Sequence, residues 1–353
     1  MKKIISKLSF FVIVGLCLGL LGYMGFKTFQ YISADLEDDG RFFTGMITDG
    51  GGINDQSFQE SAWKGMQQFS AETGSKVQYI ECPQASDFFI NIDKFADAKA
   101  DLVWGIGYKL ADVIEHAAKI NPEINYAIAD YSFGENTLDN VTGVVFRAEE
   151  SSFLAGYLAA LTTKKNVVGF VGGIKGMVID QFEYGYRAGV AYGAKQLGKK
   201  IDVKVQYAES FTDAAKCKAI AIKMFDDCDV IFHAAGGGGT GIIEAAKETG
   251  KYAIGADMDQ RKLAPKNVLT SAIKDVGKAI NIISTRVKNG ENLGGQSFSF
   301  GIKEGCVGLP GENPNIPEAV MKKVEKVKDK ICKEEIVPPG TSEKYEEFMK
   351  RLA

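Results

Sequence analysis

The stretch that decides the fold is residues 42–58, FFTGMITDGGGINDQSF, in which an apolar run ends in an acid, three glycines and an aromatic residue. The aromatic and β-branched residues in its first half are typical of a strand. The glycines allow sharp backbone turns, and Asp55 or Ser57 can cap the helix that follows. Because ligands of open α/β sheets bind at the carboxyl ends of strands, the stretch predicts a binding site faced by Asp49 and Phe58.

Strand and helix patterns alternate outward from this stretch. The first predicted strands are Phe42–Thr48, Val77–Cys82, Leu102–Gly105, Tyr126–Ala129 and Val141–Phe146. Amphipathic spacing predicts helices between them at Ser57–Phe69, Phe88–Ala98 and Leu110–Lys119. A βαβ series of this kind forms a parallel sheet.

A second series repeats this layout. Its predicted strands are Val167–Val171, Val203–Tyr207, Val230–His233, Tyr252–Ala256 and Val268–Ile273, and its helices are Glu149–Leu161, Asp180–Gln196, Asp213–Phe225, Gly241–Glu248 and Val276–Lys288. We therefore predict an α/β fold with two doubly wound parallel-sheet lobes joined by a hinge, with crossovers near Arg147, near Lys274 and after Gly301. The first lobe would comprise residues 42–147 plus 275–353, and the second residues 148–274. The tail from Gly305 is expected to pack on the first lobe.

Composition narrows the class of function. A chain of 353 residues that is 45% hydrophobic can bury a large core, and a net charge of -3 without an arginine-rich tract argues against binding of nucleic acid. With two histidines, no Cys/His metal spacing and no GxSxG motif, we expect no metal, no cofactor and no enzymatic activity. The cysteines beyond the N-terminal segment are expected to be mainly small buried hydrophobes.

The N-terminus predicts export. An uncharged run of about 19 residues, from position 8 to position 26, follows Lys2, Lys3 and Lys7. A helix of this length is about as long as a bilayer core is thick. We interpret residues 1–27 as a membrane anchor or signal segment and residues 28–41 as a linker. Three alternatives stay open: an uncleaved anchor, lipidation at Cys17, or cleavage after Ala34. Each places the globular part outside the cytoplasmic membrane.

Several strand ends carry candidate ligand-binding residues. Phe232 lies near the end of a strand, and the glycine run that follows, with Gly236 and Gly237, opens a helix. The run lacks the Lys-Ser/Thr of a phosphate-binding loop, so its amides would instead approach a polar ligand. If Phe58 and Phe232 faced each other across a closing cleft, the two rings would sandwich a planar heterocycle.

Charged residues end other strands. Asp130 follows one predicted strand, Asp257 and Asp259 follow another, and Lys274 follows a third. Carboxylates accept hydrogen bonds from hydroxyl groups, so acids at the strand ends of both lobes suit a ligand with several hydroxyls. Lys274 could balance these charges or donate to the ligand.

These residues lie within motifs that resemble the basic membrane protein family of exported substrate-binding proteins. The matching motifs are Thr48-Asp49, Ile53 to Phe58 with Trp63, Phe146 to Tyr157, Gly169 to Gly173, Tyr184 to Gly189, Ala234 to Gly237, Ile254 to Gln260 and Val307 to Pro310. The resemblance covers about Thr44 to Pro338. It implies a type I periplasmic-binding-protein fold that holds a nucleoside between its lobes, as in the spirochaete purine nucleoside receptor lipoproteins.

The resemblance also implies roles for individual residues. Phe58 and Phe232 match the aromatic pair that sandwiches the base, and Asp49, Asp257 and Lys274 match residues that bind the ribose. Further ligand contacts are implied at Asn54, Asp130, Gly236 and Gly237.

The leading hypothesis is therefore a membrane-tethered, monomeric protein that captures inosine, guanosine or adenosine for an ABC permease. The alternatives are a protein that binds a sugar or sugar-like signal, a surface adhesin or host-interaction lipoprotein, and an extracytoplasmic nucleoside hydrolase. A hydrolase would need an acid cluster or a positioned base that the sequence does not supply.

Overall fold

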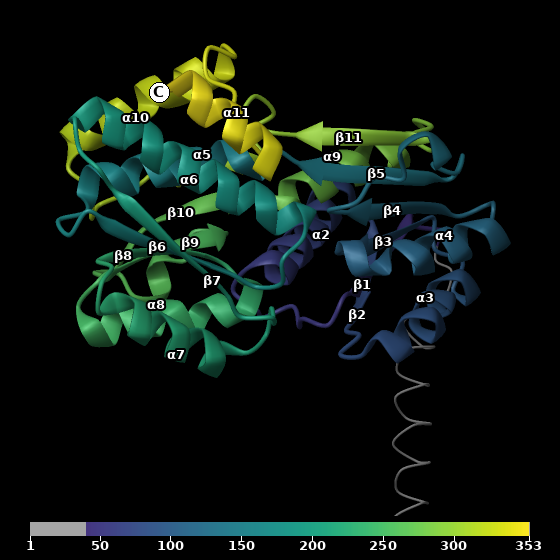
Figure 1. The fold of residues 1–353 in the computed structure, drawn as a ribbon. Coiled ribbons are helices and arrows are strands. Elements are labelled where there is room, and N and C mark those ends of the chain that lie inside the picture. The colour runs from purple at the N-terminus through teal and green to yellow at the C-terminus, as the bar shows by residue number, and fades with distance from the viewer. Residues whose placement is uncertain (1–39, 353) are drawn as a thin grey trace, which may run out of the picture. The chain divides into compact units, whose positions relative to one another are not determined.

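The computed structural model describes residues 40–352. The predicted membrane segment and Cys17 lie outside these residues. Within residues 40–352, no helix is long and apolar enough to span a bilayer. A compact unit begins at Phe42, and it contains two six-stranded sheets (Figure 1).

The first sheet has the strand order β11-β5-β4-β3-β1-β2, with every pair parallel. Its strands are β1 Phe43–Thr48, β2 Lys76–Ile80, β3 Leu102–Ile106, β4 Asn125–Ala129, β5 Val141–Phe146 and β11 Gln296–Phe300. Its helices are α2 Phe58–Thr73 and α9 Val276–Lys288 on one face, and α3 Phe88–Asp97 and α4 Ala111–Ile120 on the other (Figure 1). These elements form the first lobe. Helices cover both faces, so its central strands are almost entirely buried and mostly apolar.

The second sheet has the order β12-β10-β9-β8-β6-β7, in which only β12 is antiparallel to its neighbour. Its strands are β6 Val167–Gly172, β7 Asp202–Tyr207, β8 Val230–Ala234, β9 Tyr252–Asp257, β10 Val268–Lys274 and β12 Val307–Gly308. The pairs α5 Ala148–Thr162 with α6 Met177–Leu197 and α7 Ala214–Phe225 with α8 Gly239–Thr249 pack around it to form the second lobe. The described chain also has short 3-10 turns at η1 Ala85–Asp87, η2 Tyr108–Leu110, η3 Gly134–Asn136, η4 Gly236–Gly238 and η5 Arg261–Leu263.

The chain passes between the two sheets three times. The crossovers join β5 to α5 at Arg147, β10 to α9 after Lys274, and β11 to β12 through residues 301–306. Arg147 ties the first crossover to the third, because its guanidinium donates to the Ser299 carbonyl at 3.0 Å and pairs with Glu304 at 2.5 Å.

The sequence prediction did not include β11. Its residues QSFSF are mostly polar and exposed, as is usual at the edge of a sheet, and they lack the continuous apolar run that marks the central strands.

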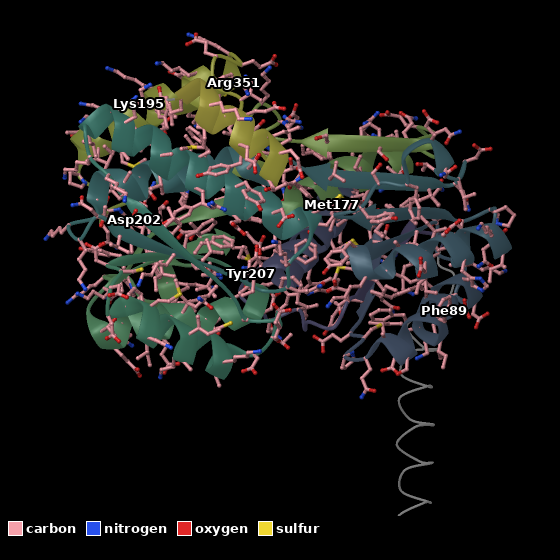
Figure 2. All side chains as sticks on the ribbon, viewed as in Figure 1. Phe89, Met177, Lys195, Asp202, Tyr207 and Arg351 are labelled. Atoms are coloured by element: carbon pink, nitrogen blue, oxygen red, sulfur yellow. The ribbon has the colours of Figure 1, made fainter. Side chains whose placement is uncertain are left out.

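The expectation that the C-terminal tail packs on the first lobe is wrong. β12 pairs with β10, α10 Glu318–Cys332 packs on α5, and α11 Ser342–Leu352 packs on α6. The ring of Phe348 meets Phe153 edge-on, with centroids 5.8 Å apart. Lys195 Nζ donates to the carbonyl of Leu352, and Figure 2 shows Lys195 and Arg351 at the same edge of the molecule. We therefore propose that the tail belongs to the second lobe.

The contact between α5 and α6 depends on close approach of two backbones. α5 is buried along most of its length, and glycines at 156, 185, 189 and 193 lie at the crossing. A Cβ atom at Gly189 would overlap the carbonyl oxygen of Phe153, and one at Gly156 would overlap that of Tyr186. The helices can pack at this distance because these positions carry no side chain.

We expect Gly189→Ala to destabilise the protein by about 1–3 kcal/mol, because the added methyl group must push α5 and α6 apart. Thermal unfolding followed by circular dichroism measures the effect. Gly311→Ala is the control, since Gly311 is exposed with open space around its Cβ position, and a change within about 0.5 kcal/mol is expected there. Equal unfolding temperatures for the two variants would contradict the packing argument.

Candidate functional site

A cavity of about 720 Å³ lies between the carboxyl ends of the strands of the two lobes. This volume is within the range of small-molecule sites. Eight predicted residues line it: Asp49, Asn54, Phe58, Asp130, Gly236, Gly237, Asp257 and Lys274. Val178 and Ile179 of α6 also line it, directly after Met177, which Figure 2 shows at the side of the second lobe nearest the first.

Lys274 forms the centre of the charged part of the cavity. It ends β10 and is only 2% exposed. Its Nζ lies 2.6 Å from Asp130 Oδ2 in the first lobe and 3.9 Å from Asp257 Oδ1 in the second. The same ammonium lies 4.4 Å from the centroid of the Phe58 ring, within the range of a cation–π contact.

The two carboxylate partners of Lys274 have the same backbone conformation. Asp130 follows β4 with φ 64°, and Asp257 ends β9 with φ 63°, so each adopts the left-handed conformation directly at a strand end. Aspartate tolerates this conformation better than most residues. Burial raises the pKa of both carboxyl groups, and the charge of Lys274 opposes that rise.

Asp49 lies at the end of β1, in the wall that the first lobe contributes. Its Oδ1 accepts a hydrogen bond from Gln59 Nε2 at 2.7 Å, and its other oxygen packs where a Cβ atom at Gly107 would lie. Burial raises the pKa of Asp49 to about 6, and the charge of Lys109 opposes the rise. A carboxylate with one side-chain donor retains capacity for a ligand hydroxyl.

Asp55 is the residue that caps α2. Its Oδ1 accepts from the backbone N–H groups of Ser57 at 2.8 Å and Glu60 at 3.0 Å, and its Oδ2 accepts from that of Gln59 at 3.0 Å. The Ser57 hydroxyl instead donates to Asp257 Oδ2 in the other lobe. Of the two caps that the sequence allowed, the structure therefore has Asp55, and Ser57 is free to link the lobes.

Two predicted site residues lie outside the cavity. Phe232 is fully buried in the second lobe, with its ring centroid 5.1 Å from that of Tyr186 and 5.5 Å from that of Phe170. It is a core residue of a strand that is covered on both faces, so it does not face the cavity. Asp259 is exposed and pairs with Arg261, at 3.0 Å from its backbone nitrogen.

The sequence interpretation missed Phe211. This residue lies in the loop between β7 and α7 and lines the cavity from the second lobe. Lys109 Nζ of the first lobe lies 5.3 Å from its ring centroid. The rule that ligands bind beyond strand ends could have found Phe211, because it follows β7 by four residues. Gln59, Tyr108, Lys109 and Phe182 also line the cavity and were not predicted.

Among residues 40–352, no group of His, Cys, Asp and Glu side chains is placed to hold a metal ion. Four of the five cysteines described are buried, and all five are thiols.

Comparison with known proteins identifies the family. The family model described as "Bmp: ABC transporter substrate-binding protein PnrA-like" matches residues 42–342. The chain belongs to this family. Substrate-binding proteins of ABC systems bind a small-molecule ligand and act with a permease outside the cytoplasm.

Individual relatives agree with this assignment. Basic membrane protein A of Borreliella burgdorferi is 40% identical over 308 residues, which covers 86% of this chain and 89% of the relative. A CD4+ T-cell-stimulating antigen of Listeria innocua is 38% identical and covers 91% and 94%. The crystal structure of an ABC transporter solute-binding protein from Aeropyrum pernix superposes with a TM-score of 0.78 at 25% identity, covering 88% and 97%. The predicted two-lobed fold is therefore confirmed.

We expect Asp49→Asn to stabilise the ligand-free protein above pH 6.5 by about 1–3 kcal/mol, and to have much less effect at pH 4. The pKa of Asp49 is raised in the folded chain, so the folded state loses stability as pH rises from the ordinary carboxyl range through about 6. Asparagine carries no charge and can still accept the bond from Gln59. Urea unfolding at pH 4, 5, 6 and 7.5 measures the difference, and a constant difference at all four values would contradict this assignment.

Proposed function

We propose that this substrate-binding protein captures a purine nucleoside between its lobes and delivers it to an ABC permease. The observation that carries the proposal is a single cavity lined by Phe58 from the first lobe, Phe211 from the second, and a buried cluster of carboxylates around Lys274. Flat apolar walls suit a base, and the charged cluster suits the hydroxyls of a ribose.

The base would lie between Phe58 and Phe211. Lys274 contacts one face of the Phe58 ring, so the base would stack on the other face. Phe211 takes the part that the sequence assigned to Phe232, because Phe232 is enclosed by core aromatics. Each stack is expected to contribute about 0.5–1.5 kcal/mol beyond the burial of apolar area. Asn54 would donate to the edge of the base. The Gln59 amide already donates to Asp49 and to the Ile106 carbonyl, so Gln59 would instead accept through its unpartnered Oε1.

The ribose would be held by Asp49, Asp257 and Lys274, with Asp130 fixing the ammonium. Carboxylates accept hydrogen bonds from hydroxyls, while the ammonium donates. The backbone at Gly236 and Gly237, at the start of the turn that leads into α8, would approach the polar atoms that remain.

The charge of the cavity favours an uncharged ligand. Six acidic residues and two lysines line it: Asp49, Asp55, Glu81, Asp130, Glu209 and Asp257, with Lys109 and Lys274. A phosphate group would meet like charges, and the only cations among these residues are already close to Asp130 or the Phe211 ring.

The aromatic lining speaks against a sugar as the preferred ligand. Sugar sites commonly use indole rings, but Trp104 is fully buried and Trp63 packs against Tyr79 with centroids 4.7 Å apart. Neither tryptophan lines the cavity. A built cavity with buried charges also favours ligand capture over a purely adhesive role.

We propose a monomer held at the outer face of the cell membrane by its N-terminal segment or by a lipid on Cys17.

We expect Phe58→Ala and Phe211→Ala each to weaken inosine binding about 10- to 100-fold, because each removes one wall of the base site. Isothermal titration calorimetry on the full chain in detergent measures the affinity. Phe89→Ala is the matched control, since Phe89 is 45% exposed and outside the cavity, and it should bind inosine normally. Tight binding of free sugars without a response to inosine, guanosine or adenosine would overturn the proposal.

We expect inosine monophosphate to bind at least about tenfold more weakly than inosine, because its phosphate adds negative charge beside several carboxylates. Competition calorimetry measures the ratio. Glu81→Gln and Glu209→Gln each remove a negative charge from the cavity lining. Both variants should therefore bring the affinity for inosine monophosphate closer to that for inosine. Equal affinity for nucleoside and nucleotide would contradict the electrostatic part of the proposal.

A further inference from the structure

A glutamine outside the ligand cavity joins the two lobes. Gln260 follows β9 in the second lobe and is 1% exposed. Its Nε2 donates to the backbone carbonyl of Gln56 in the first lobe at 2.9 Å. Gln56 is two residues before Phe58 and has a left-handed backbone, with φ 58°. The hydrogen bond therefore holds the segment that presents Phe58 to the cavity.

The Ala256 N–H and His233 together determine which way the Gln260 amide points. The Gln260 Oε1 accepts from the Ala256 N–H at 3.1 Å and lies 2.8 Å from His233 Nε2. A backbone N–H can only donate, so the atom between these two groups must be the oxygen. His233 Nε2 then carries the proton, and the amide NH₂ is left facing Gln56.

The surroundings of His233 fit this tautomer. Its Nδ1 is buried and has no hydrogen-bond partner among the described residues, so a proton on it would be a buried donor without an acceptor. Burial also lowers the pKa of His233 to about 4, which favours the neutral ring. Gly239 leaves room for the imidazole, because a Cβ atom there would overlap it. The Gln260 backbone is fixed separately, since its N–H donates to Ser271 Oγ at 3.1 Å.

We propose that His233 is a positioning residue for lobe closure: it orients Gln260 so that the amide clasps the Gln56 carbonyl and holds Phe58 in the closed site. The adjacent hydrogen bond, from the Ser57 hydroxyl to Asp257, fixes the residue that follows Gln56 in the same segment. Two neighbouring residues of the first lobe are thus held by one strand end of the second, which sets the position of α2 against β9.

Spin labels on the full chain test the clasp directly. Asp112→Cys on α4 and Lys247→Cys on α8 are exposed sites on different lobes, and Cys17 and Cys332 are replaced by Ser to keep labelling specific. Pulsed electron resonance gives the interlobe distances with and without inosine. We expect Gln260→Met and His233→Phe each to shift the population toward longer distances. Inosine should also dissociate roughly three- to tenfold faster from both variants, as loss of one hydrogen bond predicts.

A double variant separates positioning from a general packing effect. If His233 acts through Gln260, adding His233→Phe to Gln260→Met should change neither distance nor dissociation rate further. His233→Gln keeps a donor and should restore much of the closed population. Independent, additive effects would overturn the proposal, as would unchanged distances in Gln260→Met or a wild-type chain that never closes. A failure of inosine to bind would count against the proposed function, while the ligand-free distances would still decide the clasp.

Discussion

Burial of the Lys274 ammonium is the constraint on which the rest of the site depends. A buried cation is costly unless it is paired, and its partners come from both lobes. Asp130 reaches it from the first lobe and Asp257 from the second, each at a strand end with left-handed backbone. Separation of the lobes would remove one of these carboxylates from the ammonium, so charge compensation and closure are coupled.

The acids of the cavity differ in how the protein compensates their charge. The lysine lowers the cost of ionising its two neighbours, although burial still raises the pKa of both. Burial also raises the pKa of Asp49 and that of Asp55 to about 6. Asp55 compensates by capping α2 through three backbone N–H groups. Asp49 has fewer protein partners, and it is accordingly the carboxylate best suited to bind a ligand hydroxyl.

The strand-end rule accounts for both the success and the failures of sequence prediction. Asp49, Asp130, Asp257 and Lys274 were found because parallel strands bring their carboxyl ends to one edge. Phe232 was predicted to face the cleft but lies in the core. A strand that is buried on both faces gives no sequence signal for which of its side chains face a cleft. Asp259 was predicted to contact the ligand but lies outside the cavity. It is two residues beyond the end of β9, where the chain has already turned and the side chain pairs with Arg261. The lobe on which the tail packs depends on long-range contacts such as Phe348 with Phe153, for which no local pattern exists.

The three crossovers also determine which motions the molecule permits. Two bodies joined by one segment can twist and slide, but three neighbouring segments resist both and leave bending as the soft mode. The first and second crossovers are each hydrogen-bonded to the third, from Arg147 N to Phe300 O at 2.8 Å and from Asp275 N to Cys306 O at 2.6 Å. A ligand of different size would therefore be accommodated by a change in the angle between the lobes, with the register of the facing side chains preserved. The lobes can therefore rotate about a single axis through the crossovers, while twisting and sliding are resisted.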